Sequence, residues 1–188
     1  MNIFALDDNP KIAAQYHNNA HCIKMILECS QLLCTAHRVL DGKEVIEKTA
    51  SGRNIKRWKL EDERDVKLYK STHISHPSAI WCRQSDSNYR YLYDLLVELC
   101  KEYTFRYGKI HKCESSGLVS FLETQPKNIP IGEFIQVTPA MPEEYKIQND
   151  SVASYRNYYN KSKQHLASWV GKVNSRPIPE WFVLENPS

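Results

Sequence analysis

The first 40 residues contain the longest run of helical periodicity in the chain. Apolar side chains recur at spacings of three and four from about Pro10 to Leu40, which is the period of a helix with a buried face. Asp8 and Asn9 precede the proline as capping residues, and Asp41 and Gly42 end the pattern. We therefore expect one long helix over residues 10–40.

Three later segments also have a helical pattern. Residues 85–107 place apolar and aromatic side chains on one face and are followed by Gly108, a typical helix terminator. A turn at residues 75–78 leads into a short helix, residues 151–169 form a third long pattern, and the aromatic tail at residues 176–182 is expected to dock on the body. The predicted fold is mainly α: a compact, single-domain helical bundle over residues 1–188, with a long first helix and extended proline-rich connections.

Two segments interrupt this helical pattern. Residues 43–70 are strongly charged, with a basic cluster at residues 53–59 followed by an acidic one at residues 61–65. They are either an exposed, mobile, lid-like insertion or a merely solvated connection. Residues 125–145 contain four prolines, Pro126, Pro130, Pro139 and Pro142, which predict an extended segment that follows the surface.

The composition is that of a globular protein. Of the 188 residues, 41% are hydrophobic and 25% are charged, and neither a Gly/Ser tract nor a repeat is present. No apolar run approaches the length of a membrane span, so we expect a cytoplasmic protein without a membrane partner. The six cysteines lack a CxxC pair and lie mainly in apolar helical patterns, which favours buried free thiols over disulfides. The net charge of +3 permits a polyanionic ligand without requiring one.

One face of the first predicted helix carries a line of ionisable side chains. His17, His21, Lys24 and Glu28 follow one another at spacings of four, three and four residues, so they lie within about 60° of one another around the helix axis. Such a line is ordinarily the solvated face of an amphipathic helix. Apolar residues cover most of the remaining circumference, however, which favours a line of ionisable groups along a cleft.

Glu28 is the strongest catalytic candidate in this line. A carboxylate one turn from an ammonium and two turns from an imidazole can act as a general base or stabilise a cationic intermediate. The alternative is an ordinary ion pair between Lys24 and Glu28, which contributes only a few tenths of a kcal/mol. Either arrangement can contain that pair, so it does not decide between them.

The order of several motifs resembles the endonuclease-V-type pyrimidine-dimer DNA glycosylases of phages and their bacterial relatives. An early His followed seven residues later by the catalytic Glu corresponds to His21 and Glu28, with Asn18, Asn19 and Lys24 between or before them. The His-Pro that precedes a short Trp-containing segment corresponds to His76, Pro77 and Trp81. The aromatic helix before Gly108 and the late Pro-Glu-Trp-Phe at residues 179–182 are similar as well.

This resemblance implies a compact helical fold, a DNA or nucleotide ligand, no cofactor, and cleavage of an N-glycosidic bond with Glu28 acting on the sugar side. It also implies that the protein could be encoded by a phage and act in the cytoplasm of the host cell. The phage enzymes form a Schiff base through the α-amine of a Thr that Met removal exposes, whereas Asn2 follows Met1 here. Because the Asn side chain is large enough for Met1 to be retained, we expect hydrolysis without the amine-dependent lyase step. The Arg that precedes the catalytic Glu is replaced by Leu27.

Other basic and aromatic residues are candidates for substrate binding. Those at the end of the second long helix suit a phosphate clamp, although the helix dipole alone favours cations there. Those in the third helix suit base stacking, although aromatic residues at helical spacing are more often part of a core. Trp81 and Arg83, beside His76, could line a base pocket, and the alternative is a core tryptophan under a proline-capped turn. The complete set of predicted substrate-binding residues is His17, Asn18, His76, Trp81, Arg83, Arg106, Lys109, His111, Arg156 and Tyr159.

Two classes of function remain open. The leading hypothesis is an N-glycosidase-like enzyme with Glu28 as base or oxocarbenium stabiliser and with His21 and Lys24 orienting the substrate. The alternative is a non-catalytic nucleic-acid or nucleotide-binding protein with the same fold. A zinc or iron site that includes His17, His21 and Glu28 is weakly indicated, since neither a complete HExxH nor a Cys pair accompanies it, and we predict no metal.

Overall fold

A computed structural model describes residues 1–185, which are 48% helical with 8% in strands. The fold is therefore mainly helical and compact, as predicted, whereas the arrangement as a bundle stays a prediction. The elements, in chain order, are α1 (Pro10–Tyr16), α2 (Asn19–Asp41), β1 (Lys43–Lys48), β2 (Asn54–Lys59), α3 (Arg64–Lys67), α4 (Pro77–Cys82), α5 (Asp86–Tyr107), α6 (Lys112–Ser115), α7 (Leu118–Phe121), the 3-10 turn η1 (Glu143–Tyr145), α8 (Ser151–Ser162) and the 3-10 turn η2 (Gln164–Leu166).

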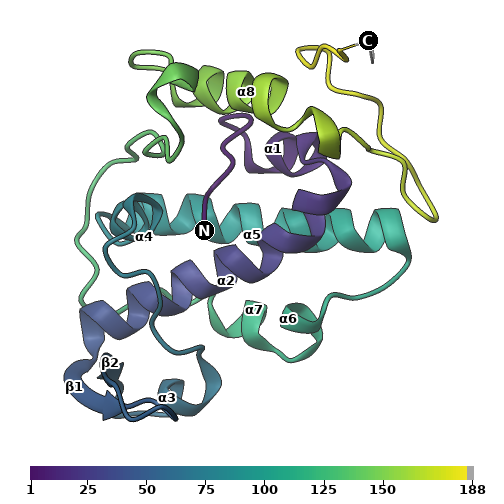
Figure 1. The fold of residues 1–188 in the computed structure, drawn as a ribbon. Helices are drawn as coiled ribbons and strands as arrows, with labels where there is room; N and C mark the ends of the chain where they lie inside the picture. The colour runs from purple at the N-terminus through teal and green to yellow at the C-terminus, as the bar shows by residue number, and fades with distance from the viewer. Residues whose placement is uncertain (186–188) are drawn as a thin grey trace.

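The predicted single helix over residues 10–40 is two helices, so that prediction is wrong at one point. His17 has an extended backbone with ψ of 131° and ends α1. Asn18 is the N-cap of α2, because its side-chain oxygen accepts a hydrogen bond of 2.9 Å from His21 N. The break turns the chain between the two helices, as Figure 1 shows.

Helices α2 and α5 cross through the centre of the molecule and form most of the core between them (Figure 1). The apolar faces of both helices are fully buried, with Ile26 and Leu33 on α2 and Leu92 and Leu96 on α5 as examples. The expectation that protein surrounds α2 on nearly all sides is wrong. Ile23 and Leu27 are 42% and 41% exposed, so one apolar strip of α2 faces the solvent.

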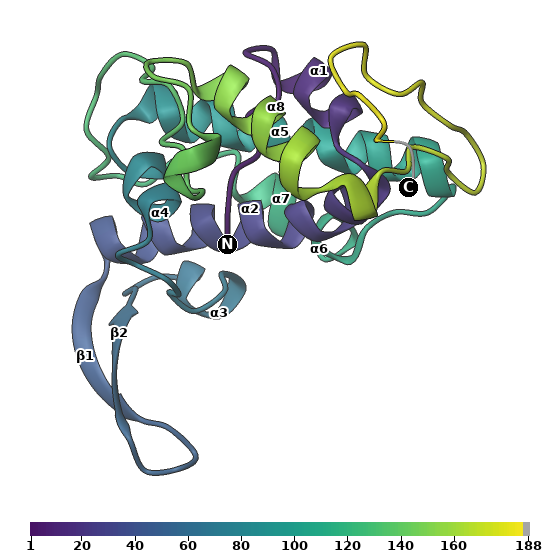
Figure 2. The same cartoon turned by 45° about the horizontal axis from the view of Figure 1, so that its top comes forward.

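The N-terminal segment and α8 pack together over another face of α2. The N-terminal segment runs between α2 and α8, with Ile3 and Leu6 fully buried (Figures 1 and 2). Helix α8 ends at Ser162, earlier than the expected Trp169, because the chain turns into η2. Trp169 is nevertheless buried, and Phe182 of the aromatic tail packs against it with ring centroids 5.0 Å apart.

The charged segment over residues 43–70 contains regular structure that the sequence pattern did not predict. Strands β1 and β2 pair antiparallel, from Lys43 opposite Lys59 to Lys48 opposite Asn54. This hairpin projects away from the helices, as Figure 2 shows, and α3 follows it. Residues 126–142 contain neither helix nor strand.

All six cysteines are buried and free, as the sequence indicated. Across residues 1–185, no helix has both the length and the apolar character needed to cross a membrane.

Candidate functional site

The carboxylate of Glu28 lies in the middle of α2 and is held by three nitrogen atoms. The backbone N–H of Asn2 donates a hydrogen bond of 2.9 Å to Oε2, and the α-amino nitrogen of Met1 lies 3.8 Å from the same oxygen. Lys24 Nζ lies 3.3 Å from Oε1. Glu28 is only 8% exposed, so the carboxylate is largely shielded from water while it stays close to one amide and two amines.

The position of the N-terminal segment is fixed by the side chain of Asn2. Its amide nitrogen donates to Ala140 O at 2.9 Å, and its amide oxygen accepts from the Tyr155 hydroxyl at 2.8 Å. Asn2 therefore joins α8 and the proline-rich segment to the first residues of the chain. These contacts bring the backbone of Asn2 to Glu28, which no local pattern in the sequence indicates.

His21 is buried on the same side of α2 as Glu28. Its Nδ1 lies 2.6 Å from the Tyr159 hydroxyl, and its ring stacks on Phe4 with centroids 4.2 Å apart. Burial, together with the smaller effects of the nearby His17 and Lys163, lowers the pKa of His21 to about 3. The imidazole is consequently neutral at physiological pH and can act there as a hydrogen-bonding group rather than as a cation.

His76, another predicted binding residue, lies at the start of α4, a helix that packs against α2. It is the N-cap of α4, and its Nδ1 accepts a hydrogen bond from Ser78 N at 3.2 Å. Burial lowers the pKa of His76, the α-amino group of Met1 and the ring of His73 lower it further, and Glu28 raises it. The charge of Glu28 in the middle of α2 therefore acts on the His-Pro turn.

The first residue of the ionisable line, His17, belongs to the break between α1 and α2. It is fully buried, and its Nδ1 lies 2.7 Å from Ala13 O. Burial lowers the pKa of His17 to about 4. Asn18 is 1% exposed and caps α2. Both residues stabilise the chain reversal, which does not fit their prediction as substrate-binding groups.

Arg106 was expected in a phosphate clamp, and its position contradicts that expectation. The side chain is fully buried and pairs with Glu102 at 2.7 Å. Its guanidinium donates to His17 O at 2.8 Å and to Gln15 O at 2.9 Å, which are carbonyls left free where α1 ends. Arg106 therefore stabilises the helix break and has no donor directed to a ligand on the surface.

The expected base-stacking residues are also parts of the core. Trp81 is fully buried and donates its indole N–H to Ile135 O at 2.8 Å, and Tyr159 is fully buried against His21. Arg156 donates to Leu6 O and pairs with Asp7 at 2.9 Å, which ties α8 to the N-terminal segment. Neither ring reaches the surface, which contradicts the prediction of Trp81 in a base pocket and of Tyr159 in a base-stacking surface.

Three further predicted binding residues, Lys109, His111 and Arg83, form neither a hydrogen bond nor an ion pair with Glu28 in the described part of the chain. Lys109 is exposed, and His111 caps α6 by accepting a hydrogen bond from Cys113 N at 3.2 Å. Both follow the end of α5, where Arg106 contacts the Asn19 side chain at the start of α2. Glu28 lies nine residues further along α2, a distance of about 14 Å. Arg83 is partly buried and donates to Ala79 O within α4.

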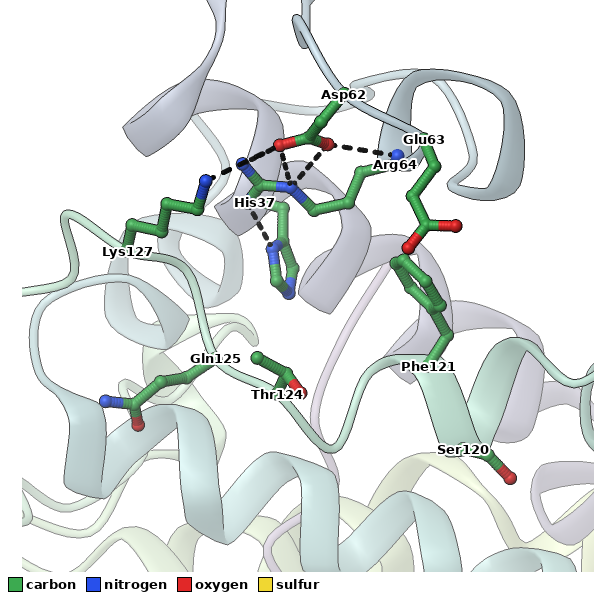
Figure 3. Close-up of a pocket in the computed structure, with 9 residues that line it drawn as sticks. All are labelled: His37, Asp62, Glu63, Arg64, Ser120, Phe121, Thr124, Gln125 and Lys127. Atoms are coloured by element: carbon green, nitrogen blue, oxygen red, sulfur yellow. Dashed lines mark hydrogen bonds and ion pairs between the residues drawn. The ribbon is translucent and has the colours of Figure 1, made fainter.

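A cavity of about 460 Å³ lies elsewhere and contains none of the predicted residues. Figure 3 shows the side chains of His37, Asp62, Arg64 and Lys127 directed toward one another. Arg64 pairs with Asp62 at 2.8 Å, Lys127 lies 3.8 Å from the same carboxylate, and Arg64 Nη1 lies 3.2 Å from His37 Nδ1. Asp62, Arg64 and Lys127 are therefore paired with one another in the cavity, while Glu63 pairs with Lys67 at 2.7 Å.

Within residues 1–185, no group of three or more His, Cys, Asp or Glu side chains has an arrangement that could hold a metal ion. No protein-family model matches this chain, and no curated protein or solved structure matches it either. The candidate site consequently rests on its own geometry: Glu28 with Lys24, Asn2 and the Met1 α-amino group, and with His21 and His76 nearby.

Proposed function

We propose that the protein is an N-glycosidase-like enzyme that acts on DNA or nucleotides. The observation that carries the proposal is the carboxylate of Glu28, which is 8% exposed and held by the Asn2 N–H at 2.9 Å and by Lys24 at 3.3 Å. A fixed carboxylate beside a solvent boundary can remove a proton from a water molecule that attacks the sugar. It can equally stabilise the positive charge that develops on the sugar as the base departs.

The neighbouring side chains supply complementary roles in this proposal. The side chain of Lys24 is 66% exposed, so its ammonium can contact a phosphate of the substrate while it also neutralises Glu28. Neutral His21 and partly buried His76 provide hydrogen-bonding groups for a sugar or base. The substrate would enter over the exposed apolar strip of Ile23 and Leu27, which lies on the same helix.

The non-catalytic alternative is less well supported by the positions of the aromatic residues. Trp81 and Tyr159, which would have stacked on bases, are fully buried. A binding protein needs accessible groups of this kind, because stacking contributes much of the affinity for unpaired bases. A buried, immobilised carboxylate adds nothing to the binding of a polyanion, which favours a chemical role for Glu28.

The test is base release from a panel of nucleotides and modified DNA duplexes, measured by mass spectrometry, with Glu28→Gln as the inactive variant. We expect release by the parent from at least one substrate, with loss of release and retained binding in Glu28→Gln. Release from no member of the panel, with tight binding to one of them, would favour the non-catalytic alternative.

A further inference from the structure

The hairpin formed by β1 and β2 carries the excess positive charge of the molecule. Residues 43–59 contain six basic and two acidic side chains, a net charge of +4, whereas the whole chain carries +3. The remaining residues are therefore slightly acidic as a group. The hairpin is the part of the fold that projects furthest from the helices, as Figure 2 shows.

Three basic residues of the hairpin make no ion pair among the described residues: Lys48 and Arg53 at its tip, and Arg57 of β2, whose guanidinium donates to Ser71 O at 2.7 Å. Nearer the body, Lys56 pairs with Glu44 at 2.8 Å and Lys59 pairs with Glu47 at 3.4 Å. None of the ion pairs within residues 1–185 includes Lys48 or Arg53, and both side chains are exposed. The tip therefore presents two unpaired positive charges to the solvent.

The turn holds these two cations at a fixed separation from the body. Thr49 N donates to Arg53 O at 2.8 Å, and Gly52 N donates to Thr49 O at 2.8 Å. Gly52 has a φ of 79°, the left-handed conformation that a short hairpin loop requires and that glycine adopts without strain. The tip is thus a closed turn rather than a loose loop.

The shape of the hairpin selects among polyanions. A two-stranded ribbon fits the major groove of B-form DNA, which is about 12 Å wide, whereas the major groove of A-form RNA is too narrow for side chains to enter. One face of this ribbon, formed by alternating residues, presents Ile46 at 59% exposure beside Lys56 and Lys48. Apolar and cationic side chains on one ribbon face suit the methyl groups and phosphates of duplex DNA.

We propose that residues 43–59 form a DNA-binding arm that docks on duplex DNA through Lys48 and Arg53. This inference rests on the proposed function, since it specifies duplex DNA as the substrate class. Glu28 lies thirteen residues before the end of α2, where the hairpin begins. That distance is about 20 Å along the helix axis, the length of about six base pairs. The arm would hold the duplex at a site about half a helical turn or more from the base that is processed at Glu28.

The test compares duplex binding by the full chain and by the double variant K48E/R53E. The control, K11E/K101E, changes net charge by the same amount at two exposed lysines on α1 and α5. Fluorescence anisotropy with a labelled 20-base-pair duplex is recorded at several salt concentrations. We expect K48E/R53E to bind about tenfold more weakly or worse, with the slope of log K against log salt reduced by about 1.8, and the control to bind like the parent.

Further measurements keep the outcome decisive. K48Q/R53Q removes the two charges without reversing them and should give an intermediate loss, and thermal unfolding should show that all variants are folded. Four outcomes would each contradict a DNA-binding role of the hairpin. These are equal binding by K48E/R53E and the parent, equal weakening in the control, no duplex binding by the parent, and tighter binding by the parent to single-stranded DNA. Failure of the proposed function can be distinguished from failure of this inference. If the parent binds duplex DNA through the hairpin tip but releases no base, the DNA-binding role of the hairpin holds and the glycosidase activity is contradicted.

Discussion

The backbone N–H of Asn2 donates a 2.9 Å hydrogen bond to Glu28 Oε2. This contact joins the first residues of the chain to the middle of α2, and it leaves the second carboxylate oxygen near Lys24. The orientation of the Glu28 carboxylate is therefore determined by the main chain of the N-terminal segment and not only by its own helix. Positioning of this kind reduces the reorganisation that a catalytic group must undergo during a reaction.

Glu28→Gln should abolish turnover while leaving the fold intact. A glutamine oxygen can still accept from Asn2 N–H, but the amide can neither remove a proton nor stabilise a developing cation as a carboxylate does. General-base contributions are typically about 100-fold to 10,000-fold, so base release should fall by at least about 100-fold. Glu98→Gln, which alters an exposed pair with Lys101, is the matched control and should release base at the parental rate. Comparable rates in the parent and Glu28→Gln would contradict a catalytic role.

Arg106→Met should destabilise the protein rather than weaken ligand binding. The variant leaves Glu102 without its closest partner and frees the carbonyls of Gln15 and His17 in the interior. Removal of one member of a buried ion pair costs about 3 kcal/mol or more, measured as the free energy of unfolding in urea.

The control for Arg106 is Arg90→Met, since Arg90 is exposed and its nitrogen lies 4.0 Å from Asp94. Its effect should stay within about 0.5 kcal/mol. If Arg106→Met kept the parental stability and lost affinity for DNA, the result would support the phosphate-binding role that the sequence predicted for Arg106.

The helices with strong local end signals could be predicted from the sequence, and the break at His17 could not. Helix α5 begins after a Ser85 cap and ends at Gly108, which has a φ of 64°. Both ends depend on neighbouring residues. The break between α1 and α2 instead depends on Arg106, which lies 89 positions from His17 in the chain. Periodicity within residues 10–40 contains no trace of that contact.

Only the part of the candidate site that lies on α2 could be predicted from the sequence. The spacing of His21 and Glu28 predicted that both lie on one side of a helix, and both are buried polar residues of α2. It could not identify Asn2, whose approach depends on contacts with Ala140 and Tyr155 far along the chain. The hairpin was missed because charged side chains lie on both faces of its strands, so residues 43–59 lack a clear apolar stripe.

Stability should fall as the pH decreases from about 7 to 5, because three buried histidines resist protonation in the folded state. Burial lowers the pKa of His21 to about 3 and the pKa of His17 and His37 to about 4, whereas the unfolded value is about 6.5. The unfolded chain therefore binds more protons below pH 6.5, and each histidine removes about 1.4 kcal/mol per pH unit until its folded pKa is reached.

Urea unfolding at a series of pH values measures this slope directly. His21→Phe should reduce the slope of the unfolding free energy against pH by about 1.4 kcal/mol per pH unit, the contribution of one proton. His165→Gln, at an exposed position, should leave the slope unchanged. A free energy of unfolding that is constant between pH 7 and 5 would show that the three imidazoles are protonated as readily in the folded protein as in the unfolded chain.

The amine next to Glu28 makes one further chemical step testable. The α-amino nitrogen of Met1 lies 3.8 Å from Glu28 Oε2, although the sequence led us to expect hydrolysis without an amine-dependent step. In a protein whose chain begins at Met1, this amine could attack the sugar carbon exposed after base release, with loss of water and formation of an imine. Borohydride would reduce the imine to a stable amine and leave a covalent protein–DNA product.

A chain extended by two glycines before Met1 is the matched comparison, because it retains Glu28 and Asn2 but moves the free amine away from the carboxylate. If the lyase step is absent, as the sequence indicates, neither protein should be trapped by borohydride on DNA that contains an abasic site, and both should release base alike. Trapping of the protein that begins at Met1, with at least about tenfold less in the extended chain, would assign an imine-forming role to the amine. Equal trapping of both proteins would instead indicate that a lysine side chain forms the imine. Lys24 would then be the first residue to substitute, because its Nζ lies 3.3 Å from Glu28 Oε1.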